Sequence, residues 1–184
     1  SRQRDWGIPI PLFFESESGE LHPEQNEIFN KASEAIKKTG IDSWKNLELG
    51  VDDKGFEKSK DIFDVWFDSG ITHYCVMDER FGSNTQAELY LEGSDQHRGW
   101  FQSSLLTSIA MKGTSPFKSV LTHGFVVDDS GRKMSKSIGN VVDPKDIIQN
   151  SGADILRFWI ASTDFRGEMT FSKDIFDRSI DGFR

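Results

Sequence analysis

Cysteine is nearly absent from this sequence, and histidine is scarce. Cys75 is the single cysteine, so no internal disulfide can form, and it makes no metal-binding spacing with the four scattered histidines. No apolar run approaches the roughly 18 residues that a membrane-spanning helix needs, and the N-terminus lacks the apolar core of a secretion signal. These absences predict a soluble, cytoplasmic protein without a protein-bound metal or a membrane segment. No obligate protein partner is predicted.

Positive charge is also in short supply. Aspartate and glutamate number 30 against 22 lysines and arginines, which gives a net charge of −8. This balance excludes a broad polyanion-binding surface, so a contact with nucleic acid would need local basic spots or domains outside the chain. The sequence does have enough apolar material for one folded domain, with 184 residues of which 36% are hydrophobic and 12% aromatic.

The most informative pattern is a cationic loop at residues 132–140, Arg-Lys-Met-Ser-Lys-Ser-Ile-Gly-Asn. Lys133 and Lys136 are three residues apart, so both ammonium groups can reach one anion, while Ser135 and Ser137 can donate hydrogen bonds. This composition suits a polyphosphate, and the alternative is a solvated surface turn. A Walker-type phosphate loop is excluded by spacing, because it needs glycine directly before the lysine.

Apolar periodicity and turn residues predict an alternation of strands and helices. Helices are expected over residues 23–39, 96–112, 144–150 and 152–162, a buried strand over 87–91, a second strand over 120–127, and an extended edge segment over 8–14. Asp143 is expected to cap the helix that Pro144 begins. Residues 41–61 are polar and acidic and are interpreted as a surface excursion. The rhythm indicates an α/β fold, namely half of a doubly wound parallel sheet.

Polar residues stand at the predicted C-terminal end of the strand over residues 87–91, where open α/β sheets bind ligands. A carboxylate such as Glu92 suits an ammonium group there, and Asp95 with the Gly93 backbone suits the two hydroxyls of a ribose. The alternative for Asp95 is a cap on the following helix.

Residues 133–137, Lys-Met-Ser-Lys-Ser, are one signature of class I aminoacyl-tRNA synthetases (the KMSKS loop), and this chain closely resembles the isoleucyl-tRNA synthetases of that class. The resemblance covers most of the chain and follows the family's order. It is carried by residues 1–7, 64–70, 91–101, 123–127, 133–137, 139–144 and 152–154. The valyl and leucyl relatives share the lysine loop and match less well over residues 92–100.

The resemblance implies a Rossmann-like sheet and an enzyme that activates isoleucine with ATP and Mg²⁺, forms isoleucyl-adenylate, and transfers the isoleucyl group to tRNA(Ile). It implies that Lys133 and Lys136 stabilise charge in the reaction, since such a step depends on positioning and electrostatics. The residues that it implies for ATP or adenylate binding are Gly93, Asp95, His123, Phe125, Ser135, Lys136 and Ser137. For His123 a purely structural, hydrogen-bonded role is the alternative.

The resemblance also implies an amino-acid site. Glu92 would hold the amino group, Gln96 would lie beside the amino acid, and Trp66 and Trp100 would wall its aliphatic side chain. The alternative for each tryptophan is a place in the core.

Two parts of the family pattern are missing from these residues: the His-Ile-Gly-His type motif and the editing domain. We therefore expect residues 1–184 to be the C-terminal half of a class I catalytic domain, inactive alone, with a surface insertion at 20–61 and a nucleotide-binding core with the lysine loop at 87–162. The alternatives are a non-catalytic module that binds nucleotide or adenylate, and the equivalent part of a valyl or leucyl enzyme.

Overall fold

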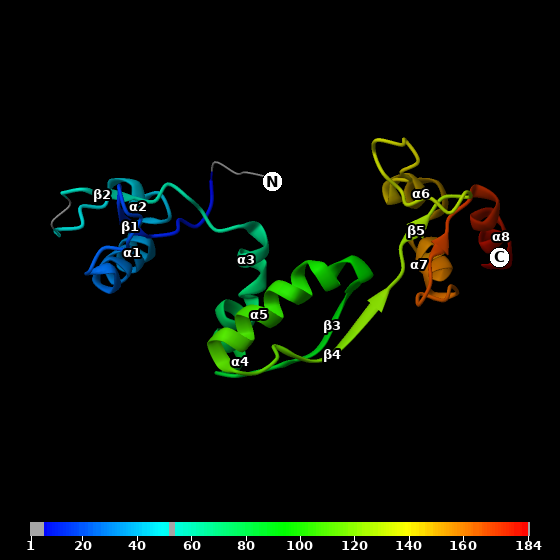
Figure 1. The fold of residues 1–184 in the computed structure, drawn as a ribbon. Helices are drawn as coiled ribbons and strands as arrows, with labels where there is room; N and C mark the ends of the chain where they lie inside the picture. Colours follow the sequence, from blue (N-terminus) through cyan, green and yellow to red (C-terminus); the bar gives the residue numbers. More distant parts are fainter. Residues whose placement is uncertain (1–5, 52–53, 184) are drawn as a thin grey trace. The chain divides into compact units, whose positions relative to one another are not determined.

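The computed structural model describes residues 6–51 and 54–183, so the first five residues of the N-terminal family block lie outside it. The chain divides into two compact units, Ser1–Ser69 and Gly70–Arg184, which are labelled by element in Figure 1. Both units combine helices with small sheets, which confirms the α/β class. None of the helices in the described part of the chain is long and apolar enough to cross a membrane.

The first unit packs a long helix on a small antiparallel sheet. Its elements are β1 (Phe13–Glu15), α1 (Gln25–Thr39), α2 (Ser43–Asn46), β2 (Phe56–Lys58) and α3 (Val65–Gly70), whose last residue opens the second unit. Strands β1 and β2 pair antiparallel, with Phe13 opposite Lys58. Helix α1 confirms the predicted helix, and Gly40 ends it with a φ of 88°, a conformation that favours glycine.

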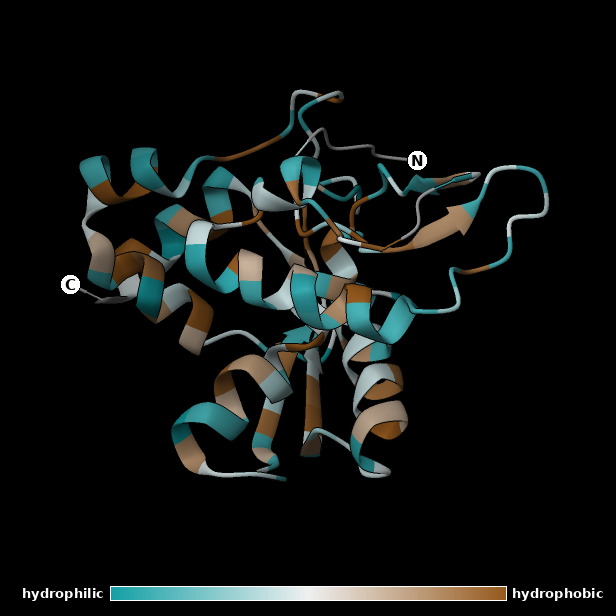
Figure 2. Cartoon of the chain, turned by 90° about the vertical axis from the view of Figure 1, so that its left-hand side faces the viewer, coloured by the Kyte–Doolittle hydropathy of each residue, from teal (hydrophilic) through white to brown (hydrophobic). Residues whose placement is uncertain are grey.

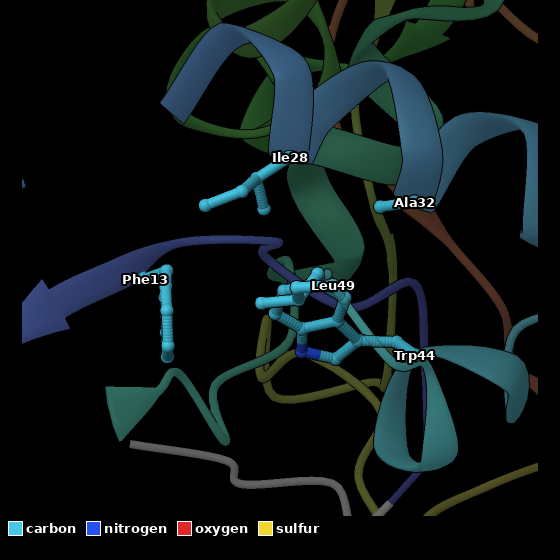
Figure 3. Close-up of a cluster of buried hydrophobic side chains, with 5 residues drawn as sticks. All are labelled: Phe13, Ile28, Ala32, Trp44 and Leu49. Atoms are coloured by element: carbon cyan, nitrogen blue, oxygen red, sulfur yellow. The ribbon is translucent and has the colours of Figure 1, made fainter. Parts of the chain in front are cut away.

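The core of the first unit draws on the segment that was expected to lie on the surface. Phe13, Ile28 and Ala32 are joined in this core by Trp44 and Leu49, and Figure 3 shows the five side chains converging from β1, α1 and the chain around α2. The Trp44 indole donates a hydrogen bond to the Ser59 carbonyl at 3.0 Å. Residues 41–61 are thus not a mere surface excursion, because two large apolar side chains anchor them.

The second unit begins with short helices and a parallel strand pair. These elements are η1 (a π-helix, His73–Asp78), α4 (Glu79–Phe81), β3 (Ala87–Gly93), η2 (a 3₁₀ turn, Ser94–Arg98), α5 (Trp100–Lys112) and β4 (Phe117–His123). The predicted helix over residues 96–112 is therefore split between η2 and α5. Ring contacts of Tyr90 and Phe101 with Phe117 show that α5 packs on the two strands (Figure 1).

Strand β3 exists as predicted, but the prediction that it is buried is wrong within the described chain. Leu89 and Leu91 are 46% and 51% exposed, and Val120 and Leu121 of β4 are also exposed. Helix α5 covers Tyr90, which is buried, on the other face. Figure 2 shows the many apolar residues of the strands and helices in brown.

The strand predicted over residues 120–127 is two strands. Strand β4 ends at His123, and β5 (Val126–Val127) begins after Gly124 and Phe125 and pairs in parallel with β6 (Met169–Thr170). The Gly124 N–H donates to the Phe165 carbonyl at 2.9 Å instead of continuing the β4 ladder. Apolar residues flank Thr122, His123 and Gly124 in this stretch. The glycine marks a place where a strand can break, and the contact of Gly124 with Phe165 shows that it does break there.

The rest of the second unit is a helical cluster around β5 and β6. Its helices are α6 (Pro144–Ser151), α7 (Ala153–Ala161) and α8 (Lys173–Phe183). Ile155, Trp159 and Phe176 form its buried core. The expected cap is confirmed: the Asp143 carboxylate accepts a hydrogen bond from the Lys145 N–H at 2.9 Å, with Pro144 at the first helical position.

Replacing Asp143 by alanine should destabilise the second unit by about 1 kcal/mol, because the first turn of α6 loses the acceptor for one of its free N–H groups. Urea unfolding of the chain measures this, and Asp143→Ser, which keeps an acceptor, is the matched control. Equal losses in the two variants would show that the cap bond contributes nothing.

Candidate functional site

The candidate site starts where two parallel strands end together. In the β3–β4 ladder, Glu92 lies opposite Thr122 and Gly93 opposite His123. Both strands run in the same direction, so their carboxyl ends form one edge, and the segments that follow them leave from that edge. The polar residues after β3 and the residues after β4 are thereby brought together.

Gly93 lies at the centre of this edge and is buried. A Cβ atom added at Gly93 would lie 2.7 Å from Asp95 Oδ1, 3.7 Å from the His123 ring and 3.8 Å from the Phe125 ring. A methyl group at the first of these distances would require the Asp95 carboxylate to move, so the absence of a side chain at Gly93 lets Asp95 take its present position. Three residues predicted for nucleotide binding thus surround a fourth.

The lysine loop reaches the same edge through Phe125. The Lys133 ammonium lies 3.6 Å from the centroid of the Phe125 ring, a cation–π contact. The Phe125 ring therefore lies close both to the Lys133 ammonium and to Gly93. Gly93 and Lys133, which are 40 positions apart in the sequence, thus both lie near the ring of Phe125.

The second lysine of the loop is placed differently. Lys136 is exposed, and within the described residues its ammonium makes no hydrogen bond or ion pair. The two serines that flank it bond to each other, Ser135 Oγ to Ser137 Oγ at 2.9 Å, and Ser135 Oγ also accepts from the Ile138 N–H at 3.3 Å. The loop is folded by its own polar groups, and Lys136 is left open to a ligand.

The carboxylates at the C-terminal end of β3 face solvent. Glu92 and Asp95 are both exposed, and Asp95 Oδ2 accepts from Gln96 Nε2 at 3.3 Å. Gln96 Oε1 in turn accepts from the Trp100 N–H at 2.9 Å, so Gln96 links the carboxylate to the start of α5. Among the described residues no backbone N–H of the following helix donates to Asp95, which removes the capping alternative.

The two tryptophans predicted to wall the amino-acid pocket lie in different units. Trp100 opens α5 and stacks on Tyr90 with centroids 4.2 Å apart and planes within 8°. Tyr90 is fixed in turn by a 3.0 Å hydrogen bond between its hydroxyl and Ser104 Oγ. Trp66 belongs to the first unit and is 47% exposed, and the Asp64 carboxylate accepts from its N–H at 2.8 Å.

His123 makes a local hydrogen bond, from its Nδ1 to the carbonyl of Gly124 at 2.9 Å. A carbonyl oxygen can only accept, so Nδ1 is the donor in this bond. This bond is what the structural alternative for His123 requires, and it leaves Nε2 available for a ligand.

Sequence reasoning missed three residues that organise the site. Tyr90 supports Trp100, and Asp128 and Asn140 bond to each other at 2.9 Å across the base of the lysine loop. Asn140 stands in a Gly-Asn pair at the end of the loop, which is a turn signal that could have marked it. Within the described residues no group of three His, Cys, Asp or Glu side chains could hold a metal ion.

The sequence of the chain matches a known protein family. The model of the tRNA synthetases class I (I, L, M and V) matches residues 1–172, so the chain belongs to this family. Isoleucine–tRNA ligase of Vibrio vulnificus (strain YJ016) is 57% identical over the whole chain, and that of Acinetobacter baylyi is 56% identical. The isoleucine–tRNA ligase of Coxiella burnetii (strain Dugway 5J108-111) is 54% identical. The chain spans 20% of the length of each of these relatives.

A solved structure shares the fold. It is the ternary complex of Agrobacterium radiobacter K84 agnB2 LeuRS with tRNA and LeuAMS, with a TM-score of 0.67 and 20% sequence identity. The likeness covers 97% of this chain and 26% of that chain. It supports the synthetase fold for both units and identifies no substrate.

Proposed function

We propose that the chain is part of an isoleucine–tRNA ligase, in which it carries the second half of the active site. The enzyme activates isoleucine with ATP and Mg²⁺ and transfers the isoleucyl group to tRNA(Ile). The observation that carries this proposal is the shared Phe125 ring, which brings the end of β3 and the lysine loop together. An aminoacyl-adenylate needs this combination, since its ribose and its phosphate are bound by one site.

The proposed roles follow the chemistry of each group. Glu92 holds the amino group and Gln96 lies beside the amino acid, while Gly93 and Asp95 contact the ribose. The backbone of Phe125 and the ring of His123 border the adenine. Lys133, Lys136 and the hydroxyls of Ser135 and Ser137 meet the polyphosphate, where the two ammonium groups stabilise charge moving toward pyrophosphate. Trp66 and Trp100 wall the isoleucine side chain.

The fold proposed for the complete protein is a Rossmann-like doubly wound sheet, of which β3 and β4 are members. Parallel sheets are covered on both faces in α/β proteins, yet Leu89, Leu91, Val120 and Leu121 are exposed within the described chain. Further strands and helices of a larger domain would bury them. Residues 20–61 and 87–162 are proposed as its insertion and its nucleotide-binding core, and the cytoplasm, where tRNA is charged for translation, as its location.

Isoleucine-dependent exchange between ATP and pyrophosphate, with purified full-length protein that carries this chain, tests the activity. The expected result is exchange with isoleucine well above that with leucine, followed by charging of tRNA(Ile). Exchange strongest with valine or leucine would favour the equivalent part of another class I enzyme, and ATP binding without exchange would favour the non-catalytic module. The 184 residues alone should bind nucleotide without turnover.

Trp100→Ala in the full-length protein should raise the KM for isoleucine roughly tenfold and that for ATP much less, because only the aliphatic side chain loses a wall. Trp100→Phe, which keeps an aromatic face on Tyr90, is the control and should lose less. Steady-state exchange at varied isoleucine and ATP measures both constants. Equal effects on the two substrates would place Trp100 in the core.

A further inference from the structure

The lysine loop rests on a tight turn built around Asp128. Val127 bridges to Lys133, and the Asp128 N–H donates to the Arg132 carbonyl at 2.9 Å. At the tip, Gly131 has a φ of 72° and its N–H donates to the Asp128 carbonyl at 2.9 Å. This turn delivers the chain directly into Lys133.

The Asp128 carboxylate collects donors from both ends of the loop. Oδ1 accepts from the N–H groups of Ser130 at 3.0 Å and Arg132 at 2.9 Å, and Oδ2 accepts from Arg132 Nε at 3.0 Å and Asn140 Nδ2 at 2.9 Å. The side chain of Asn140, followed by the Arg132 N–H, holds the pKa of the Asp128 carboxyl far below its usual range. The carboxylate is thus charged throughout the working pH range.

Asn140 uses both ends of its amide to close the loop. Its Nδ2 donates to Asp128 and, at 3.4 Å, to the Lys133 carbonyl, while its Oδ1 accepts from the Ser135 N–H at 2.8 Å. Gly139, at a φ of 76°, allows the preceding bend, and its N–H donates to the Ser135 carbonyl at 3.1 Å. Asn140, the last residue of the loop, is therefore bonded to Lys133 and Ser135 near its start.

This closure bears on the two lysines unequally. Lys133 has a second support in the Phe125 ring, whereas Lys136 is exposed, and its ammonium makes no hydrogen bond or ion pair among the described residues. The direction in which Lys136 points depends on the backbone of residues 135–139, which the Asn140 side chain holds. A cation that stabilises a transition state is effective only when its position is fixed beforehand.

We propose that Asn140, held by Asp128, is a positioning residue that fixes the lysine loop so that Lys136 meets the polyphosphate. The proposal rests on the proposed function for its catalytic consequence, but the closure itself is a property of this chain. Asn140 touches no substrate in this account and acts through Lys136. Its loss should therefore appear in the rate of adenylate formation and little in ATP binding.

The closure is tested in the 184-residue chain by amide hydrogen exchange of residues 133–140. Asn140→Ala should speed exchange of the Ser135 N–H and its neighbours by about tenfold or more, because the acceptor that protects Ser135 is gone. Asn150→Ala is the matched control, since the Asn150 side chain donates to the Asp146 carbonyl on α6 and not to the loop. Unchanged loop exchange in Asn140→Ala would overturn the proposal whatever the enzyme's activity.

The catalytic part is tested by single-turnover adenylate formation in the full-length protein. Asn140→Ala should lower the saturated rate about tenfold or more with a small change in ATP affinity, and in a Lys136→Ala background it should cost little further. The double variant Asp128→Asn with Asn140→Asp restores an amide–carboxylate pair and keeps the acceptor for Ser135, so it should recover most of the rate that Asn140→Asp alone loses.

The outcomes separate the two proposals. An inactive wild-type protein refutes the proposed function, while the hydrogen-exchange result still decides the closure. An active protein in which Asn140→Ala and Lys136→Ala have additive effects, or in which Asn140→Ala weakens only ATP binding, refutes the positioning role and leaves the proposed function intact.

Discussion

Replacing Lys136 by alanine in the full-length protein is expected to lower the saturated rate of adenylate formation by about a hundredfold or more. The Lys136 ammonium is exposed and makes no bond within the described residues, so it is available to the polyphosphate. If it meets that group chiefly as charge moves to the leaving pyrophosphate, its energy is expressed in the transition state. ATP affinity should then change much less than the rate.

Single-turnover kinetics over a range of ATP concentrations separate binding from chemistry for this variant. Lys145→Ala, which removes an exposed lysine from the first turn of α6, is the matched control and should behave as wild type. Lys136→Arg should recover only part of the rate, because a planar guanidinium places its charge differently from a compact ammonium. An intact saturated rate with weakened ATP binding would make the loop an affinity device and not a catalytic one.

Gly124→Ala is expected to destabilise the second unit by about 3 kcal/mol or more. A Cβ at Gly124 would lie 1.9 Å from the Gly167 carbonyl oxygen and 2.8 Å from the Glu168 nitrogen. These are backbone atoms next to β6, so relief requires moving the β5–β6 pair and breaking the bond from Gly124 N–H to Phe165. The same movement would displace Phe125 from Gly93 and Lys133.

Gly167→Ala is the matched control for this substitution. A Cβ at Gly167 meets nothing within 4 Å. An alanine side chain is therefore accommodated at residue 167 but not at residue 124. Urea unfolding should show a change within about 0.5 kcal/mol for Gly167→Ala against the large loss for Gly124→Ala. Similar stabilities for the two variants would mean that the backbone around residues 124 and 167 can move apart without a loss in the free energy of unfolding.

Local signals were enough to predict several of the helices and the strand edge of the candidate site. The periodicity of residues 23–39 and the Asp143-Pro144 pair predicted α1 and the start of α6, because each depends on neighbours in the sequence. The carboxyl ends of β3 and β4 adjoin as a parallel pair requires. The proposed chemical roles of the residues at this edge stay predictions.

Contacts between distant residues could not be predicted in this way. The break at Gly124 depends on Gly167, 43 positions later, and the burial of Trp44 in an acidic stretch depends on Phe13 and Ile28. The bond of Asn140 to Asp128 joins side chains whose types suit many turns. The sequence shows that polar and apolar residues are available for such contacts. Which residues contact each other is seen only in the folded chain.

The exposed apolar residues of strands β3 and β4 also bear on the tendency of the protein to self-associate. Each strand carries a backbone edge without a strand partner in the described chain, beside exposed leucines and valine. An open edge with apolar flanks is a template on which other chains can add strands. When no other protein segment covers these strands, as on a nascent chain, we expect self-association that increases with protein concentration. Covering the strands with further parts of a larger domain should reduce it.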